Sequence, residues 1–483
     1  MVIRHCSAHG WVGSKKNSAP MSPIRDDTRH RRPGMEFPFD PRTRTTMTRT
    51  LSRSIAVIGS GVSGLTAAHV LSQRNRVTLF EADSRLGGHA HTHHLVLENG
   101  SQVSVDTGFI VHNDRTYPTL LRLFDELGVA TQESDMSMSI RSDATGIEYA
   151  GAKGLPGLFP TWRSFTKPRY LRMLGEVLRF HRAALALLES GDDGKDEPLE
   201  AFLARNRFSP FFIDHFMTPL VAAVWSCDPA LATRYPARYL FRFLDHHGML
   251  TVFGSPTWRT VTGGSGTYVD ALASRLGEVL VDTPVRSVER TDDGVCVVVG
   301  DGDVRWFDAA VIAVHPAQAL AMLARPTQAE RRILGAMPYS TNHVQLHTDT
   351  SLLPRAERAR ASWNYLTPAG GGSDEVIVTY DMTRLMRLTD VTDRRFLVTL
   401  GGAHLVDPST VLAEMTYEHP LYTPESVAAQ ECLPEISDSR ISFAGAYHGW
   451  GFHEDGARSG VEAARRLGVE WGVPSCIGAE VSP

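Results

Sequence analysis

A single stretch near the N-terminus, residues 54–81, constrains the fold of this 483-residue chain most strongly. An apolar run at 55–58 leads directly into the sequence GSGVSG at 59–64. A helical pattern follows, and a second apolar run at 77–80 ends in Glu81. A glycine turn between a strand and a helix, followed by a strand and an acid, is typical of a dinucleotide-binding βαβ unit.

The three glycines of this turn have different expected roles. Gly59 makes the tight turn, Gly61 lets the backbone approach a pyrophosphate, and Gly64 lets the helix pack close to the strand. The helix N-terminus offers unpaired N–H groups to the phosphates. Glu81 stands about 20 residues after Gly59, where an acid binds a ribose hydroxyl. The stretch therefore predicts a Rossmann-like domain that binds a dinucleotide.

The residues after Glu81 carry a resemblance to a known family. Arg85, Gly87, Gly88 and Thr92 form a segment similar to the R-x-G-G-R-x-x-T segment of the flavin-containing amine oxidase superfamily, with His89 in place of the second arginine. That superfamily includes monoamine oxidases, protoporphyrinogen oxidase and carotenoid desaturases. The resemblance implies that the cofactor is FAD and that the paired glycines lie along its pyrophosphate.

The resemblance covers most of the chain after residue 53. Residues 106–109 resemble a D-x-G segment that passes beside the flavin ring, and residues 258–276 resemble the return into the FAD domain. Residues 441–446 resemble the last strand, and 451–457 the turn into a helix that runs through Arg466. The motifs RLGGHxHT, DTGFIV and GFHEDG are most similar to an uncharacterised bacterial branch that is often encoded beside cyclopropane fatty acid synthases.

The resemblance also implies the site residues. Thr416 stands where some members have a cysteine that bonds the flavin, so we expect non-covalent FAD. Tyr417 and Phe452 would bracket the substrate, and His453 would act beside the flavin as an acid, a base or a cation. The expected cofactor-binding residues are Gly59, Gly61, Val62, Ser63, Gly64, Glu81, Ala82, Arg85, Gly87, Gly88, His89, Thr107, Gly108, Phe109, Val285, Gly445, Ala446, Phe452, His453, Glu454, Asp455 and Ala457.

The expected fold class is α/β, with a Rossmann-like FAD-binding domain interleaved with a mixed-sheet plus helical substrate domain. Residues 54–110, 255–330 and 431–470 would form the FAD-binding domain. Residues 111–254 and 331–430 would form the substrate domain, with strands at 342–347, 375–380 and 396–400. Residues 1–53, rich in Arg, Ser, Thr, Pro and His, are predicted to be a disordered extension, and 471–483 a C-terminal tail.

Composition limits the class of protein. Hydrophobic residues make up 42% of the chain and the net charge is −5, as in a globular enzyme. The five cysteines form no C-x-x-C pair, so no disulfide framework or zinc site is indicated. No apolar run is long enough to span a membrane, and no basic, aromatic stripe indicates nucleic acid. We expect a cytoplasmic protein, with peripheral membrane contact as a further prediction.

Several side chains leave two interpretations open. A dense group of phenylalanines at 202–216 predicts a helical core or, alternatively, the wall of an apolar tunnel or a membrane-docking face. Trp363 and Tyr365 are pocket or core residues. His89, His91 and His93 would share one face of a strand, but no separate ligand supports a metal site there. His448 is a further acid–base candidate or a structural histidine.

The missing lysine that many amine oxidases place near the flavin disfavours amine oxidation. We expect a long, mostly apolar cavity in front of the flavin, lined in part by residues 168–253. The expected function is therefore an FAD-dependent oxidoreductase that acts on an apolar, unsaturated fatty acyl or other lipid substrate by hydride transfer to flavin N5. The alternatives are an FAD-dependent double-bond isomerase, an amine oxidase, or a non-catalytic flavoprotein partner of a lipid-modifying methyltransferase. The expected partners are a small apolar substrate and a lipid-modifying enzyme.

Overall fold

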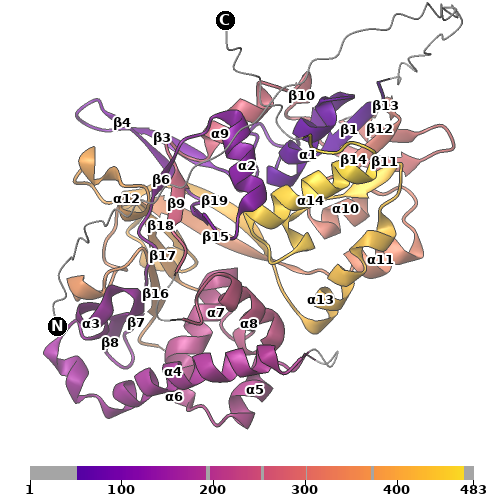
Figure 1. Cartoon of the computed structure of the whole chain (residues 1–483). Helices are drawn as coiled ribbons and strands as arrows, with labels where there is room; N and C mark the ends of the chain where they lie inside the picture. The colour runs from indigo at the N-terminus through magenta and orange to yellow at the C-terminus, as the bar shows by residue number, and fades with distance from the viewer. Residues whose placement is uncertain (1–51, 192–195, 252–254, 301, 371–374, 473–483) are drawn as a thin grey trace, which may run out of the picture. The chain divides into compact units, whose positions relative to one another are not determined.

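The computed structural model describes residues 52–191, 196–251, 255–300, 302–370 and 375–472 (Figure 1). The predicted disordered extension and C-terminal tail therefore lie almost entirely outside the described residues.

The first layer is a five-stranded parallel sheet in the order β10-β2-β1-β14-β20. Its strands are short apolar runs, buried on both faces as is usual for parallel sheets. Residues far apart in the chain pair directly, as Val57 of β1 does with Val311 of β14. The bounds are β1 Ser54–Ile58, β2 Arg76–Phe80, β10 Glu278–Leu280, β14 Ala309–Ile312 and β20 Ile441–Phe443.

Helices α1 (Val62–Ser72) and α14 (His453–Arg466) pack closely beside this sheet. A Cβ atom on Gly456 would lie 2.6 Å from the Val62 side chain, and one on Gly460 would lie 2.3 Å from the Ser63 carbonyl oxygen. Glycine is therefore required where the two helices meet. Helices α2 (Pro118–Leu127) and α9 (Gly266–Ala273) belong to the same hydrophobic core.

The second layer is a seven-stranded mixed sheet in the order β19-β15-β18-β17-β16-β7-β8. The pair β16–β7 is parallel and the other neighbours are antiparallel. The bounds are β7 Met138–Ser142, β8 Ile147–Ala150, β15 Tyr339–His347, β16 Trp363–Thr367, β17 Val378–Asp381, β18 Leu397–Leu400 and β19 Val411–Pro420.

A helical layer follows between residues 154 and 246, at the bottom of Figure 1. Phe180 lies at its centre, within 6.4 Å of the rings of Phe202, Phe208, Phe212, Phe216 and Phe241. This cluster belongs to the hydrophobic core, which confirms the core interpretation of the phenylalanines. The helices are α3 Gly154–Leu158, α4 Pro168–Glu189, α5 Leu199–Arg205, α6 Pro210–Phe212, α7 Thr218–Trp225 and α8 Ala237–His246.

Smaller elements complete the fold. An antiparallel sheet β11-β12-β13 follows β10, and the hairpin β3-β4 and the short sheet β5-β9-β6 lie elsewhere in the chain. Their bounds are β3 Thr92–Val96, β4 Gln102–Asp106, β5 His112–Asn113, β6 Thr131–Glu133, β9 Trp258–Val261, β11 Val285–Arg290, β12 Val295–Val299 and β13 Asp303–Phe307. The remaining helices are α10 Pro316–Met322, α11 Gln328–Leu334, α12 Met382–Leu385 and α13 Pro424–Glu431.

The predicted α/β class is confirmed, and one local prediction is wrong. His89, His91 and His93 do not share one strand face, because β3 begins only at Thr92 and contains only His93 of the three. His89 lies in the turn before β3, half-buried, with its ring 5.0 Å from that of Tyr417. The rings of His91 and His93 lie 4.2 Å apart.

Candidate active site

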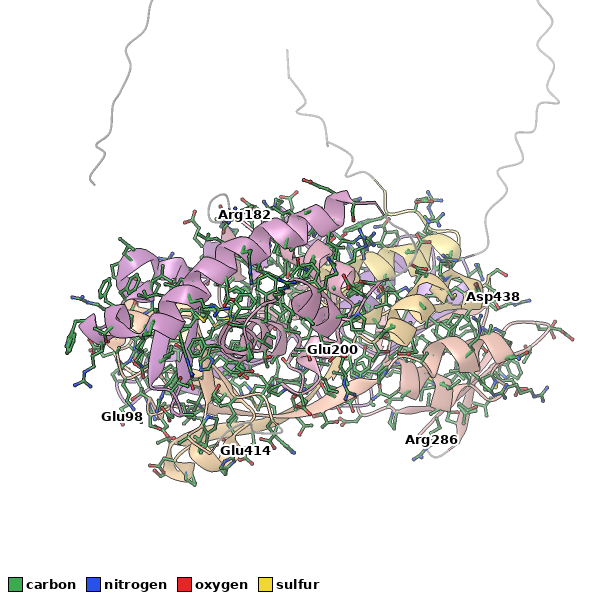
Figure 2. All side chains as sticks on the ribbon, turned by 90° about the horizontal axis from the view of Figure 1, so that it is seen from below. Glu98, Arg182, Glu200, Arg286, Glu414 and Asp438 are labelled. Atoms are coloured by element: carbon green, nitrogen blue, oxygen red, sulfur yellow. The ribbon has the colours of Figure 1, made fainter. Side chains whose placement is uncertain are left out.

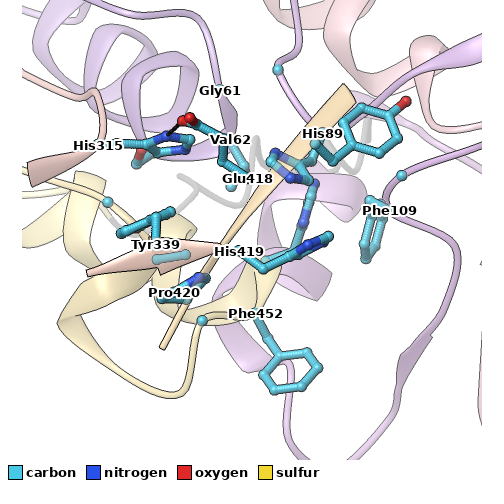
Figure 3. Close-up of a pocket in the computed structure, with 18 of the residues that line it drawn as sticks. Gly61, Val62, His89, Phe109, His315, Tyr339, Glu418, His419, Pro420 and Phe452 are labelled. Atoms are coloured by element: carbon cyan, nitrogen blue, oxygen red, sulfur yellow. Dashed lines mark hydrogen bonds and ion pairs between the residues drawn. The ribbon is translucent and has the colours of Figure 1, made fainter. Parts of the chain in front are cut away.

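A cavity of about 950 Å³ extends from the carboxyl ends of the parallel strands to the seven-stranded sheet and helices α7 and α8. Ligands bind at this end of the strands in open α/β sheets. Figure 3 shows part of its wall, with Gly61 and Val62 of the glycine turn, His89, Phe109 and Phe452.

The glycine turn leaves room at one position and is tightly packed at the other two. The Gly59 N–H donates to the Phe80 carbonyl at 2.8 Å, and Gly59 has a φ of +96°. A Cβ atom on Gly64 would lie 1.9 Å from the Gly59 carbonyl oxygen, so this glycine serves packing. A Cβ atom on Gly61 would meet nothing within 4 Å. Because Gly61 lines the cavity, that open space is available to a bound pyrophosphate.

The predicted ribose-binding acid, Glu81, is held beside the same turn. Its Oε2 accepts hydrogen bonds from the Ser60 N–H at 2.8 Å and the Ser60 hydroxyl at 2.5 Å. Its Oε1 accepts from the Asp83 N–H at 3.0 Å. These bonds fix the carboxylate at the end of β2, on the cavity wall.

Arg85 lines the cavity but bonds mostly to its own loop. Its guanidinium donates to the carbonyl groups of Leu86, Gly88 and Ala90 at 2.8–3.2 Å. This arrangement folds residues 85–90 into a loop that brings Gly88 against Gly61. The pair of loops forms a backbone-lined cradle of the kind that a pyrophosphate requires.

Four buried polar atoms on the cavity wall test whether a polar ligand fits. The Nε2 atoms of His89 and His453, the Nε1 atom of Trp363 and the hydroxyl of Tyr447 have no hydrogen-bond partner among the described residues. All four residues line the cavity. Because buried polar groups are nearly always hydrogen-bonded, these atoms indicate partners on a bound molecule. Together with the space at Gly61, they fit FAD.

Tyr417 connects the cavity to a pair of half-buried histidines. Its hydroxyl lies 2.8 Å from the Thr107 hydroxyl and 2.9 Å from His91 Nδ1, and the His91 ring in turn lies against that of His93. Burial raises the pKa of Tyr417 to about 12, so this group carries its proton at neutral pH. Burial lowers the pKa of His91 to about 4, so its imidazole is neutral. The hydrogen bond between Tyr417 and His91 forms a path along which a proton can leave the cavity, whereas His93 contacts His91 only through its ring.

His453 begins α14 and lies flat against Phe109, with ring centroids 3.7 Å apart and planes 14° apart. Burial, with a smaller contribution from the charge of His112, lowers the pKa of His453 to about 3. The lowered pKa favours the neutral imidazole at neutral pH, one of the alternatives that the sequence left open for His453. A neutral imidazole with an unpartnered Nε2 can still exchange a hydrogen bond with a ligand.

Most of the predicted cofactor residues line the cavity. Tyr417 and Phe452, predicted to bracket the substrate, also line it. The cofactor residues on the wall are Gly59, Gly61, Val62, Ser63, Glu81, Ala82, Arg85, Gly88, His89, Thr107, Gly108, Phe109, Val285, Gly445, Ala446, Phe452 and His453.

Five predicted cofactor residues do not line the cavity: Gly64, Gly87, Glu454, Asp455 and Ala457. Gly87 has φ +103° and no room for a side chain, since a Cβ atom there would lie 2.6 Å from the Ala90 carbonyl oxygen. Ala457 is fully buried in α14, whose close packing against α1 also explains its small side chain.

The two acids at the start of α14 hold the backbone together. Glu454 accepts hydrogen bonds from the N–H groups of Thr119 and Leu120, both at 3.0 Å, at the start of α2. Asp455 accepts from the N–H groups of Trp450 and Phe452 and pairs with Arg458 at 2.8 Å. Their predicted role at the cofactor is replaced by a structural one.

Two further candidates also lie away from the cavity. His448 is buried, with a pKa lowered to about 3 by burial and by Arg466 and Arg458. Tyr365 belongs to the core, whereas Trp363, two residues earlier on β16, lines the cavity. Burial and the neighbouring Cys227 and Asp228 raise the pKa of Tyr365 above its usual value.

The part of the cavity away from the glycine turn is apolar. Few of the residues that line it could be identified from the sequence. Most of its residues come from β7, α7, α8 and the middle strands of the mixed sheet, whereas α4, at the start of the range 168–253, does not line it. The alternation of inward and outward side chains along β7 and β18 is the signal that could have identified their contribution. The apolar and aromatic wall residues are Met136, Met138, Val224, Trp225, Phe243, Met249, Trp258, Val344, Trp363, Tyr380, Val398 and Leu400.

Charged side chains line only the other end. Glu81, Asp83, Arg85 and Arg286 lie at the dinucleotide end, and Glu418 pairs with His315 at 2.7 Å (Figure 3). Within the described ranges, no group of three His, Cys, Asp or Glu side chains could hold a metal ion.

Comparison with known proteins agrees with this geometry. The family model for flavin containing amine oxidoreductases matches residues 62–468. Protoporphyrinogen oxidase 2 of Arabidopsis thaliana is 30% identical over 44% of this chain and 40% of its own length. (S)-6-hydroxynicotine oxidase of Paenarthrobacter nicotinovorans is 25% identical over 57% of this chain and 63% of its own length. The matches thus span less than two thirds of either relative.

Solved structures share the fold over almost their whole length. A fatty acid isomerase from P. acnes that produces CLA has a TM-score of 0.62 at 17% identity, over 86% of this chain and 99% of its own. Cyclohexylamine oxidase from Brevibacterium oxydans has a TM-score of 0.61 at 18% identity, over 86% and 98%. With the cavity and its glycine cradle, the family match over most of the sequence leads to one conclusion: the chain belongs to the flavin-containing amine oxidoreductases, whose cofactor is FAD.

Proposed function

We propose that the chain is an FAD-dependent oxidoreductase that acts on an apolar, unsaturated fatty acyl lipid. The observation that carries this proposal is the wall of the cavity between β7 and α8. It consists of Met136, Met138, Val224 and other apolar or aromatic side chains, and the described residues place no charged side chain there.

An apolar wall favours a hydrocarbon over an amine. A charged ammonium group that leaves water is compensated most strongly by a carboxylate, whereas the aromatic rings of this wall would offer it only a cation–π contact. The carboxylates of Glu81 and Asp83 lie at the dinucleotide end, and that of Glu418 is paired with His315. An acyl chain, in contrast, is apolar, so its transfer from water into the cavity is favourable and requires no compensating charge.

The residues that line the cavity would have two roles, substrate binding and proton transfer. Met138, Trp363 and Tyr380 would hold the acyl chain and exclude water. The Tyr417 hydroxyl, fixed by Thr107 and His91, would hold or move a proton at the edge of the cavity. FAD, when bound, supplies the acceptor for a hydride from the substrate.

A second candidate, a double-bond isomerase, is favoured by the same proton path. Moving a double bond requires a proton or hydride to leave one carbon and return at another, without net oxidation. Tyr417 and His91 form a path that could serve such a transfer, and the fatty acid isomerase from P. acnes performs its reaction on the same fold.

The test is anaerobic mixing of the flavin-loaded protein with a phospholipid that carries an unsaturated acyl chain. Loss of the visible flavin band together with an oxidised product supports the oxidoreductase. A product with a moved double bond and an unchanged band supports the isomerase. Reduction by benzylamine or putrescine, but not by the lipid, would overturn the lipid proposal.

A charge placed in the apolar wall sharpens this test. We expect Met138→Glu to abolish turnover of the lipid while the flavin content stays normal. An acyl chain that bound there would remove water from the new carboxylate without giving it a partner, which is unfavourable. Val304→Glu adds the same charge at an exposed position on β13 and serves as the matched control. Unchanged lipid turnover in Met138→Glu would contradict the proposed place of the substrate.

A further inference from the structure

We propose that the outer face of residues 154–182 docks on an anionic lipid bilayer. This face, termed the α3–α4 face, comprises α3, the short helical turn at 162–166 and the outward side of α4. The proposal does not depend on the reaction that the cavity carries out.

Exposed apolar side chains are concentrated on this face. Of the eleven large apolar side chains that are exposed among the described residues, five lie within residues 155–178. They are Leu155 and Trp162 at 72% exposure, Phe165 at 58%, Leu178 at 51% and Leu171 at 42%. Single exposed apolar residues need no explanation, but a cluster of this kind indicates a surface that meets a partner.

The local structure explains why these side chains point outward. Along α4, Met173 and Phe180 face the core and are fully buried, whereas Leu171 and Leu178 are two helical turns apart on the other side. Phe165 stacks on Phe159 with ring centroids 4.1 Å apart. The outward apolar side chains therefore stay on the surface of the folded chain and do not pack into its core.

The same face is basic, although the chain as a whole is acidic. Residues 154–182 contain six Lys or Arg and one Asp or Glu, whereas the whole chain has a net charge of −5. That acid, Glu176, is buried and pairs with Arg172 and Arg179. Arg182 lies further along α4, on the side seen in Figure 2. The net positive charge of this face is complementary to anionic headgroups.

The combination of exposed aromatic and basic residues favours a bilayer over a protein partner. Trp and Phe side chains partition into the headgroup boundary, while Arg side chains reach up to the phosphates with their stems along the apolar surface. Arg163 lies over the ring of the exposed Trp162, at 5.9 Å from its centroid. None of the helices among the described residues is long and apolar enough to cross a membrane, so the proposed contact is peripheral.

The test is sedimentation of the flavin-loaded protein with vesicles. We expect binding to phosphatidylcholine vesicles that contain phosphatidylglycerol, weakened by salt, and at least about tenfold weaker binding to phosphatidylcholine alone. Trp162→Ser with Phe165→Ser should reduce binding to the anionic vesicles by about tenfold or more. Arg163→Gln with Arg169→Gln should weaken binding and reduce its dependence on salt.

The matched control is Trp306→Ser, which removes an equally exposed tryptophan (62%) from β13, well away from α4 in Figure 1. Equal loss of binding in this control and in the Trp162 and Phe165 variant would overturn the proposal. So would absence of binding to anionic vesicles. Dissociation of an oligomer by the Trp162 and Phe165 variant, with no effect on vesicles, would assign the face to a second copy of the chain instead.

Discussion

The hydroxyl of Tyr417 lies between Thr107 and His91, and this position leads to a prediction about turnover. Tyr417→Phe keeps the aromatic wall but removes the hydroxyl that connects the cavity to His91. We expect the flavin content to stay normal and turnover to fall by about 10²-fold or more, the usual contribution of a positioned acid or base. Stopped-flow measurement of the reductive or isomerising step would check this.

Tyr380→Phe is the control for Tyr417→Phe, because it removes another hydroxyl from the cavity wall. It should change turnover only slightly. An equal loss in both variants would mean that the wall hydroxyls act by packing or polarity and not by moving a proton.

Replacing two glycines of the same turn by residues with side chains should have different effects on cofactor binding and on stability. Gly61→Leu would project into the open space of the cavity, so the protein should lose FAD but keep the thermal midpoint of the flavin-free parent. Gly64→Ala would push its methyl group into the Gly59 carbonyl, so it should destabilise the fold itself by ~1–3 kcal/mol. The ratio of flavin to protein absorbance and the thermal midpoint distinguish the two. A flavin-loaded Gly61→Leu would contradict the placement of the pyrophosphate.

The carboxylate of Glu454, on α14, connects this helix to α2 by hydrogen bonds. No side chain caps α2 from its own N-cap residue, Tyr117, and Glu454 of α14 accepts hydrogen bonds from its first free N–H groups. We expect Glu454→Ala to lower the free energy of unfolding by ~1–3 kcal/mol, because it leaves two buried donors unpaired. Chemical denaturation would measure this loss.

The control on the same helix is Glu462→Ala. Glu462 is more exposed and pairs with Arg465 and Arg466 on the helix surface. Its removal should cost less than about 0.5 kcal/mol. Similar losses in both variants would contradict a specific cap on α2.

Elements with strong local signals could be predicted from the sequence, and elements that depend on distant partners could not. The strands β1 and β2 are apolar runs bounded by polar or glycine residues, so their positions were predicted to within two residues. The cap on α2 could not be predicted, because Glu454 and Thr119 stand 335 positions apart in the chain and meet only when the whole domain has folded.

The cofactor end of the cavity was more predictable than the substrate end for a related reason. Phosphate binding requires that the backbone approach the phosphate closely. This requires glycines at a fixed spacing, such as Gly59 and Gly61. An apolar wall can be built from any large apolar residue, so Met136 or Val224 carries no signal of its own in the sequence. That wall is complete only in the folded chain, where the strands of the mixed sheet and helices α7 and α8 each contribute residues to it.

Seven histidines of the described residues are buried or half-buried and neutral, which predicts sensitivity to acid. Burial lowers the pKa to about 4 or about 3 for His91, His112, His247, His347, His419, His448 and His453. Between about pH 6.5 and pH 4 the unfolded chain binds protons at these sites and the folded chain does not. Stability should therefore fall as the pH falls through this range.

Five carboxyl groups oppose this effect. Burial raises the pKa values of Asp106 and Asp455 to about 6 and also raises those of Asp196, Asp381 and Glu454, so the folded chain binds protons there that the unfolded chain does not. The seven histidines outnumber the five carboxyl groups, so we expect a net loss of stability in acid. Thermal midpoints measured from about pH 8 to pH 4 would check the sign, and a midpoint that rises toward the acid end would contradict it.

The order of strands in the parallel sheet has a consequence for how the protein is made. A ribosome delivers β1 and β2 early, but β14 follows more than two hundred residues later and β20 near the end of the chain. Helix α14, which packs against α1, emerges last of all the described helices. The nascent N-terminal βαβ unit must therefore remain open, with its apolar edge uncovered, throughout almost the whole of synthesis. Among the described elements, the nucleotide cradle is one of the first to be translated and one of the last to be closed.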